Sequence, residues 1–276
     1  MGHWVAKLNA VTDIRDLDEG DVKMIGRAVH KSLVVIIPNQ NNISQDDLVE
    51  FCETIGTVDK IPHDEDYDRH RRHTATYNWW NGVMRVTGEL NRDNEPGLFP
   101  HKEELKWHID QASTNNRNCF LALHGIRGTE GSVTGFLNNI LSYNDLPSDI
   151  KDRIKDIEIF CWARHGTYSP KSYKFFRNHI NNTNKFPLVH TNNGGETGLF
   201  FPFNQIFDWV TEQDDARELY EILKDHVLQE KYMYKHEWQD GDLVLLEQNL
   251  LLHKRYYFEN ITDRLLHRVS FDDSKL

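Results

Sequence analysis

The pattern of hydrophobic positions in the first 60 residues predicts a helix, a buried strand and a second helix. Residues 19–32 carry apolar side chains three and four positions apart, which is the spacing of a helix with one buried face. Residues 33–37 form a continuous and mostly β-branched run that stops at Pro38, as expected of a buried strand. The second helix is expected to begin after Ser44 as its N-cap and to end at Gly56.

From about residue 83 the pattern changes to short apolar runs separated by long polar segments. Such runs are typical of the strands of a sandwich or jelly roll. We predict strands at 83–87, 119–124, 157–163, 199–201, 242–246 and 265–271. Between them, helical spacing predicts helices at 132–142, 147–155 and 204–229.

The predicted fold is mainly β with α: a double-stranded β-helix (jelly roll) core with flanking helices and long insertions. The chain has no internal repeat and no linker rich in proline, glycine or serine. We therefore expect a single domain over residues 1–276, with an N-terminal α/β cap at about 1–80 and the jelly-roll core at about 81–276.

Composition narrows the possible functions. The chain has 32 Lys and Arg against 43 Asp and Glu, so its net charge of −11 argues against a dedicated nucleic-acid binder. The longest aliphatic run, 33–37, is far shorter than the roughly 20 residues of a membrane span. Three unrelated cysteines and the lack of an apolar leader predict reduced thiols in a cytoplasmic protein.

A pair of candidate metal ligands stands out in the segment Trp107-His108-Ile109-Asp110. A histidine and an acid two residues apart on a strand project to the same face, where both could reach one ion. Chance alone predicts about two such pairs in a chain with 15 His and 43 acids, and this chain has three. Trp107 and Ile109 could bury the opposite face, which favours this pair over the other two, His63/Glu65 and His101/Glu103.

The C-terminal part supplies further candidates. A polar turn at Asp240-Gly241 leads into a predicted strand, and His253 follows as a possible third ligand of a facial triad for non-haem iron. Arg264 and Arg268 would share one face of the last strand, and two inward-facing guanidiniums require anionic partners.

Taken in order, these residues resemble the taurine dioxygenase/TfdA-like family of Fe(II)- and 2-oxoglutarate-dependent dioxygenases. The pattern is Trp-His-x-Asp, then a Thr, a distal His, and Arg residues eleven and fifteen positions beyond that His. Segments 34–40, 51–56, 187–191, 196–202 and 238–244 are also similar to the family, so that the resemblance covers nearly the whole chain. Two segments depart from it. Glu247-Gln-Asn replaces the usual Asp-Asn-Arg, and residues 95–106 lack the asparagine that binds sulfonate, so taurine is not an expected substrate.

The resemblance implies a role for each matched residue. His108, Asp110 and His253 would bind Fe(II), and Arg264 with Thr134 would hold the distal carboxylate of 2-oxoglutarate. The reaction would consume O2, release succinate and CO2, and hydroxylate the substrate. The family's halogenases have a small residue in place of Asp110, so a carboxylate there favours hydroxylation.

The expected substrate is a small and anionic organic molecule, with Arg268 as its partner or, alternatively, in a structural ion pair. A basic and aromatic segment at 67–81, which includes His70 and His73, is a second candidate for substrate binding or a solvated loop. That segment supports the alternative of a nucleotide or peptidyl substrate. A non-redox jelly-roll protein that binds a metal or ligand is the other alternative, and a homo-oligomer is left open. We interpret His124, His165, His190 and His226 as structural.

Overall fold

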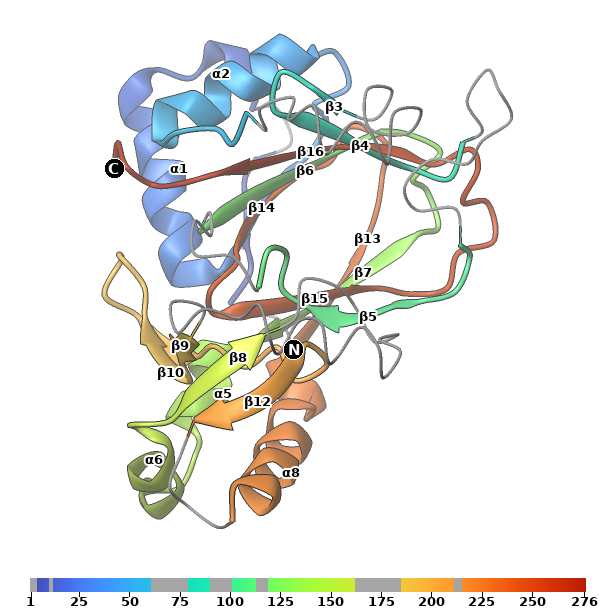
Figure 1. Ribbon diagram of the computed structural model, residues 1–276. Coiled ribbons are helices and arrows are strands. Elements are labelled where there is room, and N and C mark those ends of the chain that lie inside the picture. Colours follow the sequence, from blue (N-terminus) through green and yellow to red (C-terminus); the bar gives the residue numbers. More distant parts are fainter. Residues whose placement is uncertain are drawn as a thin grey trace, which may run out of the picture.

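The core of the molecule consists of two β-sheets that face each other. The computed structural model describes residues 4–9, 12–60, 79–89, 101–112, 119–161, 185–210 and 215–276. The larger sheet has the order β1-β2-β14-β6-β16-β4-β3, and the smaller one β13-β7-β15-β5 (Figure 1). Their strands are β1 (Ala6–Lys7), β2 (Val34–Ile37), β3 (Trp79–Trp80), β4 (Val83–Thr87), β5 (Leu105–His108), β6 (Phe120–Arg127), β7 (Val133–Asn138), β13 (Met233–Glu237), β14 (Leu243–Glu247), β15 (Leu251–Arg255) and β16 (Leu265–Phe271).

The larger sheet is covered on both faces, which explains the continuous apolar runs of its central strands. Every residue of β2 and β14 is buried. Because side chains alternate along a strand, Leu243 and Leu245 join the apolar cluster under the N-terminal helices, whereas Val244 and Leu246 face the smaller sheet. These two clusters form the walls of a layered core.

Two N-terminal helices, α1 (Glu19–Ser32) and α2 (Gln45–Ile55), cover the outer face of the larger sheet (Figure 1). A short 3-10 helix, η1 (Ile14–Asp16), precedes them. The Ser44 side chain accepts a hydrogen bond from the Asp47 amide, and the Asp47 side chain returns one, which completes a capping box. The predicted helices at 19–32 and after Ser44 are therefore confirmed.

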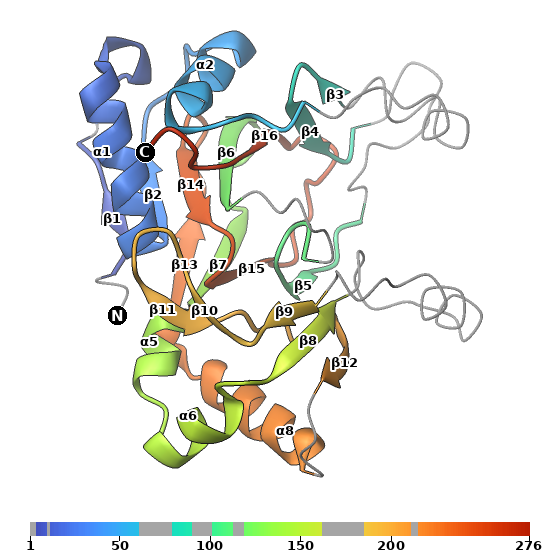
Figure 2. The ribbon, with the colours of Figure 1, turned by 60° about the vertical axis from the view of Figure 1, so that its left-hand side comes forward.

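A third layer packs on the outer face of the smaller sheet and lies at one end of the molecule (Figure 2). Leu137 of β7 and Leu252 of β15 point away from the larger sheet and pack into the apolar cluster of this third layer. It contains β8 (Glu158–Cys161), β9 (Lys185–Pro187), β10 (Val189–Thr191), β11 (Thr197–Leu199), β12 (Ile206–Val210), α5 (Asn139–Asn144), α6 (Ser148–Ile154), α8 (Ala216–Val227) and the 3-10 helix η3 (Glu230–Tyr232).

Two of the predicted helices are wrong in their first halves. Residues 132–142 begin as strand β7, which pairs with β13 and β15, and become helical only from Asn139. Residues 204–229 begin as β12, paired with β8, and the helix starts at Ala216. In both cases the apolar spacing suits a helix locally, and pairing with distant strands overrides it.

The facing sheets confirm the mainly β fold with flanking helices. The division into an N-terminal cap and a core stays a prediction, although β2 of the first part lies inside the larger sheet. All three cysteines lie in the described residues, are buried and form no disulfide bond. Within the described ranges, none of the helices has the length and apolar character needed to cross a membrane.

Candidate active site

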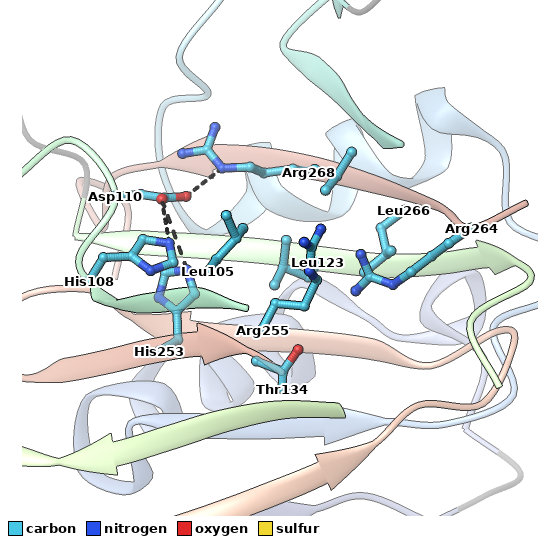
Figure 3. Close-up of a pocket in the computed structure, with 11 residues that line it drawn as sticks. Leu105, His108, Asp110, Leu123, Thr134, His253, Arg255, Arg264, Leu266 and Arg268 are labelled. Atoms are coloured by element: carbon cyan, nitrogen blue, oxygen red, sulfur yellow. Dashed lines mark hydrogen bonds and ion pairs between the residues drawn. The ribbon is translucent and has the colours of Figure 1, made fainter. Parts of the chain in front are cut away.

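A pocket opens between the two sheets, with its polar groups gathered at two ends (Figure 3). It contains about 510 Å³ of empty space, part of it open to solvent. Its lining comprises Val86, Leu105, His108, Asp110, Leu123, Thr134, His253, Arg255, Arg264, Leu266 and Arg268.

Three potential metal ligands meet at one end of this pocket. His108 ends β5, and its register partner on β15 is His253, so the two rings lie side by side with centroids 4.1 Å apart and their planes tilted by 49°. Asp110 Oδ1 lies 3.4 Å from His108 Nε2 and 3.9 Å from His253 Nε2. All three donor atoms lie within 4.8 Å of one another.

This donor set fits a divalent transition metal. An ion about 2.1 Å from each donor can join atoms up to roughly 4.2 Å apart, and both distances from Asp110 are shorter than that. Two imidazoles and one carboxylate are also the facial triad of non-haem iron. His108 Nδ1 lies 2.7 Å from the Lys106 carbonyl, which can only accept, so the proton is on Nδ1 and Nε2 is available as a ligand.

Asp110 reaches the site from a turn rather than from the strand that we predicted. β5 ends at His108, and Gln111 has a left-handed backbone with φ 56°. Arg268 donates from Nε to Asp110 Oδ2 at 2.7 Å. Burial alone would raise the pKa of the Asp110 carboxyl, but Arg268 and the two imidazoles hold that pKa well below its usual range.

Gln205 fixes the backbone of Ile109, the residue between the first two ligands. Its Oε1 accepts from the Ile109 amide at 2.8 Å, and its Nε2 donates to the Ile109 carbonyl at 2.9 Å. Asn204 adds a third bond from Nδ2 to the Trp107 carbonyl at 3.0 Å. Residues of the third layer therefore hydrogen-bond to the edge of β5 that does not pair with β15. No local pattern in the sequence indicates this contact.

The opposite end of the pocket carries a hydroxyl and a buried guanidinium. Arg264 is 3% exposed and donates from Nε to Ser132 Oγ at 3.2 Å. Burial, with a contribution from the charge of Arg255, lowers the pKa of Arg264 to about 9. Thr134 Oγ1 accepts from the Trp238 indole at 2.9 Å, which leaves its own O–H to donate to an anion.

Arg255 also lines this end, and sequence analysis did not identify it. It lies two positions after His253 on β15, and alternate residues of a strand share a face. This alternation was a signal that could have revealed it.

The structure brings together His108, Asp110, His253, Thr134, Arg264 and Arg268, as predicted. His70 and His73 lie outside the described residues, as does His165. His124 and His226 each contact a backbone carbonyl, of Gln40 and Ser142 respectively, in agreement with structural roles.

The sequence matches the Taurine catabolism dioxygenase TauD, TfdA family over residues 3–270. It is 25% identical over 168 residues to the alpha-ketoglutarate-dependent 2,4-dichlorophenoxyacetate dioxygenase of Burkholderia sp. (strain RASC), which covers 59% of this chain and 57% of that enzyme. It is 22% identical over 281 residues to the pentalenolactone F synthase of Streptomyces avermitilis, covering 93% and 88% of the two chains.

Among solved structures, the fold is similar to that of AAD-2 in complex with Mn(II) and N-oxalylglycine. The TM-score is 0.76 at 19% identity, with 98% of this chain and 94% of that one covered. The fold comparison confirms the jelly-roll prediction. Together with the family match, it shows that this chain belongs to the TauD/TfdA family and is a 2-oxoglutarate-dependent dioxygenase that uses Fe(II), 2-oxoglutarate and O2.

Proposed function

We propose that this enzyme hydroxylates a small organic anion, with Fe(II) bound by His108, Asp110 and His253 and 2-oxoglutarate held by Arg264 and Thr134. The observation that carries the proposal is the layout of one pocket, in which three metal donors and a buried guanidinium occupy opposite ends. A dicarboxylate that chelates a metal through one end needs a cation for its other end. Arg264 and the Thr134 hydroxyl suit that carboxylate.

Bound Fe(II) supplies the activation of O2 that is coupled to the conversion of 2-oxoglutarate into succinate and CO2. The chain's own residues prepare the site for this chemistry. Arg268 keeps Asp110 ionised, and Lys106 fixes the His108 tautomer. The side chains of Val86, Leu105, Leu123 and Leu266 surround the pocket with apolar surface, which limits water near the reacting groups.

The anionic substrate is inferred from Arg268 at the metal end of the pocket. In the described part of the chain, only Asp110 lies within hydrogen-bonding distance of this guanidinium, so its terminal nitrogens can bind another anion. The Burkholderia relative is named for 2,4-dichlorophenoxyacetate, which is a carboxylate. The cytoplasmic location and the homo-oligomer stay predictions, as does the nucleotide or peptidyl alternative, because its segment lies mostly outside the described residues.

The test is anaerobic addition of Fe(II) and then 2-oxoglutarate to metal-free protein, with detection of the visible metal-to-ligand charge-transfer band. Wild type should develop the band, and Asp110→Ala should lose it together with at least about 100-fold in iron affinity. Asp225→Ala, at an exposed position of α8, is the matched control and should behave as wild type. An undiminished band in Asp110→Ala would refute the triad, whereas tight iron binding by wild type without a band would favour a non-redox binding protein.

A further inference from the structure

Arg255 is a second guanidinium at the co-substrate end of the pocket. On β15 its register partners are Thr134 on β7 and Leu105 on β5, and all three line the pocket. Its side chain rises from β15 towards Leu123, in the middle of the view in Figure 3. At 5% exposure it is as well buried as Thr134 and Arg264.

Only one of its three nitrogens is used within the described structure. Nη2 donates to the carbonyls of His101 and Glu103, the latter at 2.7 Å. Nε and Nη1 are buried with no hydrogen-bond partner. Burying a donor of a charged group without a hydrogen-bond partner lowers the stability of the fold. These two nitrogens therefore indicate that a bound ligand supplies an acceptor in this pocket.

Within the described residues, neither arginine at this end forms a salt bridge, although the charge of Glu103 acts on Arg255 from a greater distance. Among the described residues, no carboxylate lies within 4.0 Å of either Arg255 or Arg264, whereas Arg268 at the other end pairs with Asp110. Like charges in a poorly solvated pocket repel, and an anion between them would offset the repulsion and accept a hydrogen bond from one of the unsatisfied nitrogens. The anion expected there is the one already assigned to Arg264.

We propose that Arg255 is a co-substrate-binding residue that donates from one of these two nitrogens to the distal carboxylate of 2-oxoglutarate, together with Arg264 and Thr134. This inference rests on the proposed function and deepens it, because it assigns two guanidiniums to one carboxylate. A purely structural Arg255 would be satisfied by the carbonyls of His101 and Glu103. That reading leaves the two buried nitrogens unexplained.

The test measures binding rather than turnover. Protein loaded with Zn²⁺ is titrated calorimetrically with 2-oxoglutarate and with 2-oxopentanoate, which keeps the chelating keto acid but lacks the distal carboxylate. Arg255→Met should weaken 2-oxoglutarate binding by about 10- to 100-fold and change 2-oxopentanoate binding by less than about threefold. Lys254→Met is the matched control, since the neighbouring side chain points out of the pocket towards Glu104 and should leave both affinities unchanged.

Each other outcome contradicts the proposal. An equal loss for both keto acids would make Arg255 a support of the 101–103 segment, and unchanged 2-oxoglutarate affinity would exclude the contact. If Arg255→Met does not fold, Arg255→Lys keeps the charge but not the planar guanidinium and should give an intermediate and still selective loss. Failure of the proposed function is recognised separately, because wild type would then not bind 2-oxoglutarate or Arg264→Met would not weaken its binding.

Discussion

The two ends of the pocket differ in how their charges are balanced. At the metal end, Asp110 contacts Arg268, His108 and His253, so every charged group has a partner of opposite or adaptable charge. At the other end, Arg255 and Arg264 face a hydroxyl and apolar side chains, and no carboxylate of the described residues lies within 4.0 Å of them.

This contrast indicates that the two ends depend on their ligands to different degrees. The metal end is assembled from groups that stabilise one another, and a metal replaces interactions that already exist. At the arginine end, the repulsion between the two guanidiniums and their burial away from water are unfavourable, and a bound anion offsets both. Binding of a dicarboxylate should therefore stabilise the protein mainly through the arginine end.

The largest expected effect comes from removing Arg264. Losing a buried charge-assisted contact should cost about 2–5 kcal/mol of 2-oxoglutarate binding. In wild type loaded with Zn²⁺, 2-oxoglutarate at about 100 times its Kd should raise the free energy of unfolding by about 2.7 kcal/mol. At the same ligand concentration Arg264→Ala should show almost none of this gain in thermal or chemical denaturation. The surface variant Arg153→Ala should retain it, and a full gain in Arg264→Ala would place the anion elsewhere.

A second experiment compares the ends without any ligand. Arg268→Met should lower the free energy of unfolding by about 2–3 kcal/mol, because it leaves the mostly buried Asp110 carboxylate without its cation. Arg264→Met should leave that free energy unchanged or raise it by up to about 1 kcal/mol, because it removes repulsion from Arg255. Urea denaturation of the two metal-free variants measures both free energies of unfolding. Equal destabilisation by the two substitutions would contradict the proposed difference between the two ends of the pocket.

The smallest effect is expected at Thr134. Replacing it with Val removes a neutral hydroxyl, so 2-oxoglutarate affinity should fall by about 1 kcal/mol, or roughly fivefold. The Trp238 indole loses its acceptor in the same variant, which should cost a similar amount of stability. Trp238→Phe separates the two, since it should reduce stability while leaving the Thr134 hydroxyl and hence the affinity nearly intact. A larger affinity loss in Trp238→Phe than in Thr134→Val would show that the indole, not the hydroxyl, shapes this wall.

The metal-ligand candidates could be predicted because they rest on short spacings in a recognisable order. His108 and Asp110 are two residues apart, and the arginines follow His253 at fixed intervals. The strand β7 was missed for the opposite reason. Its apolar residues have helical spacing, and only hydrogen bonds to β13 and β15, about 100 residues away, make it a strand.

The pair His101/Glu103 shows a further limit of sequence reasoning. Its spacing made the two side chains candidate metal ligands, whereas in the structure the backbone carbonyls of the two residues accept hydrogen bonds from the Arg255 guanidinium. Carbonyl groups carry no residue-type signal, so a contact of this kind is invisible until the chain is folded. The same holds for Gln205, which reaches Ile109 across 96 positions of sequence.

The two hydrogen bonds of Gln205 also bear on how long the enzyme survives. Neither peptide group that flanks Ile109 can rotate without breaking one of these bonds, and the Gln205 side chain that makes both belongs to the third layer of the molecule. Local opening of that layer, which requires less energy than global unfolding, would free the turn between two metal ligands. On heating, loss of activity should then precede loss of the β-sheet circular-dichroism signal. The lifetime of the active enzyme would be set by the stability of the third layer and not by that of the two facing sheets.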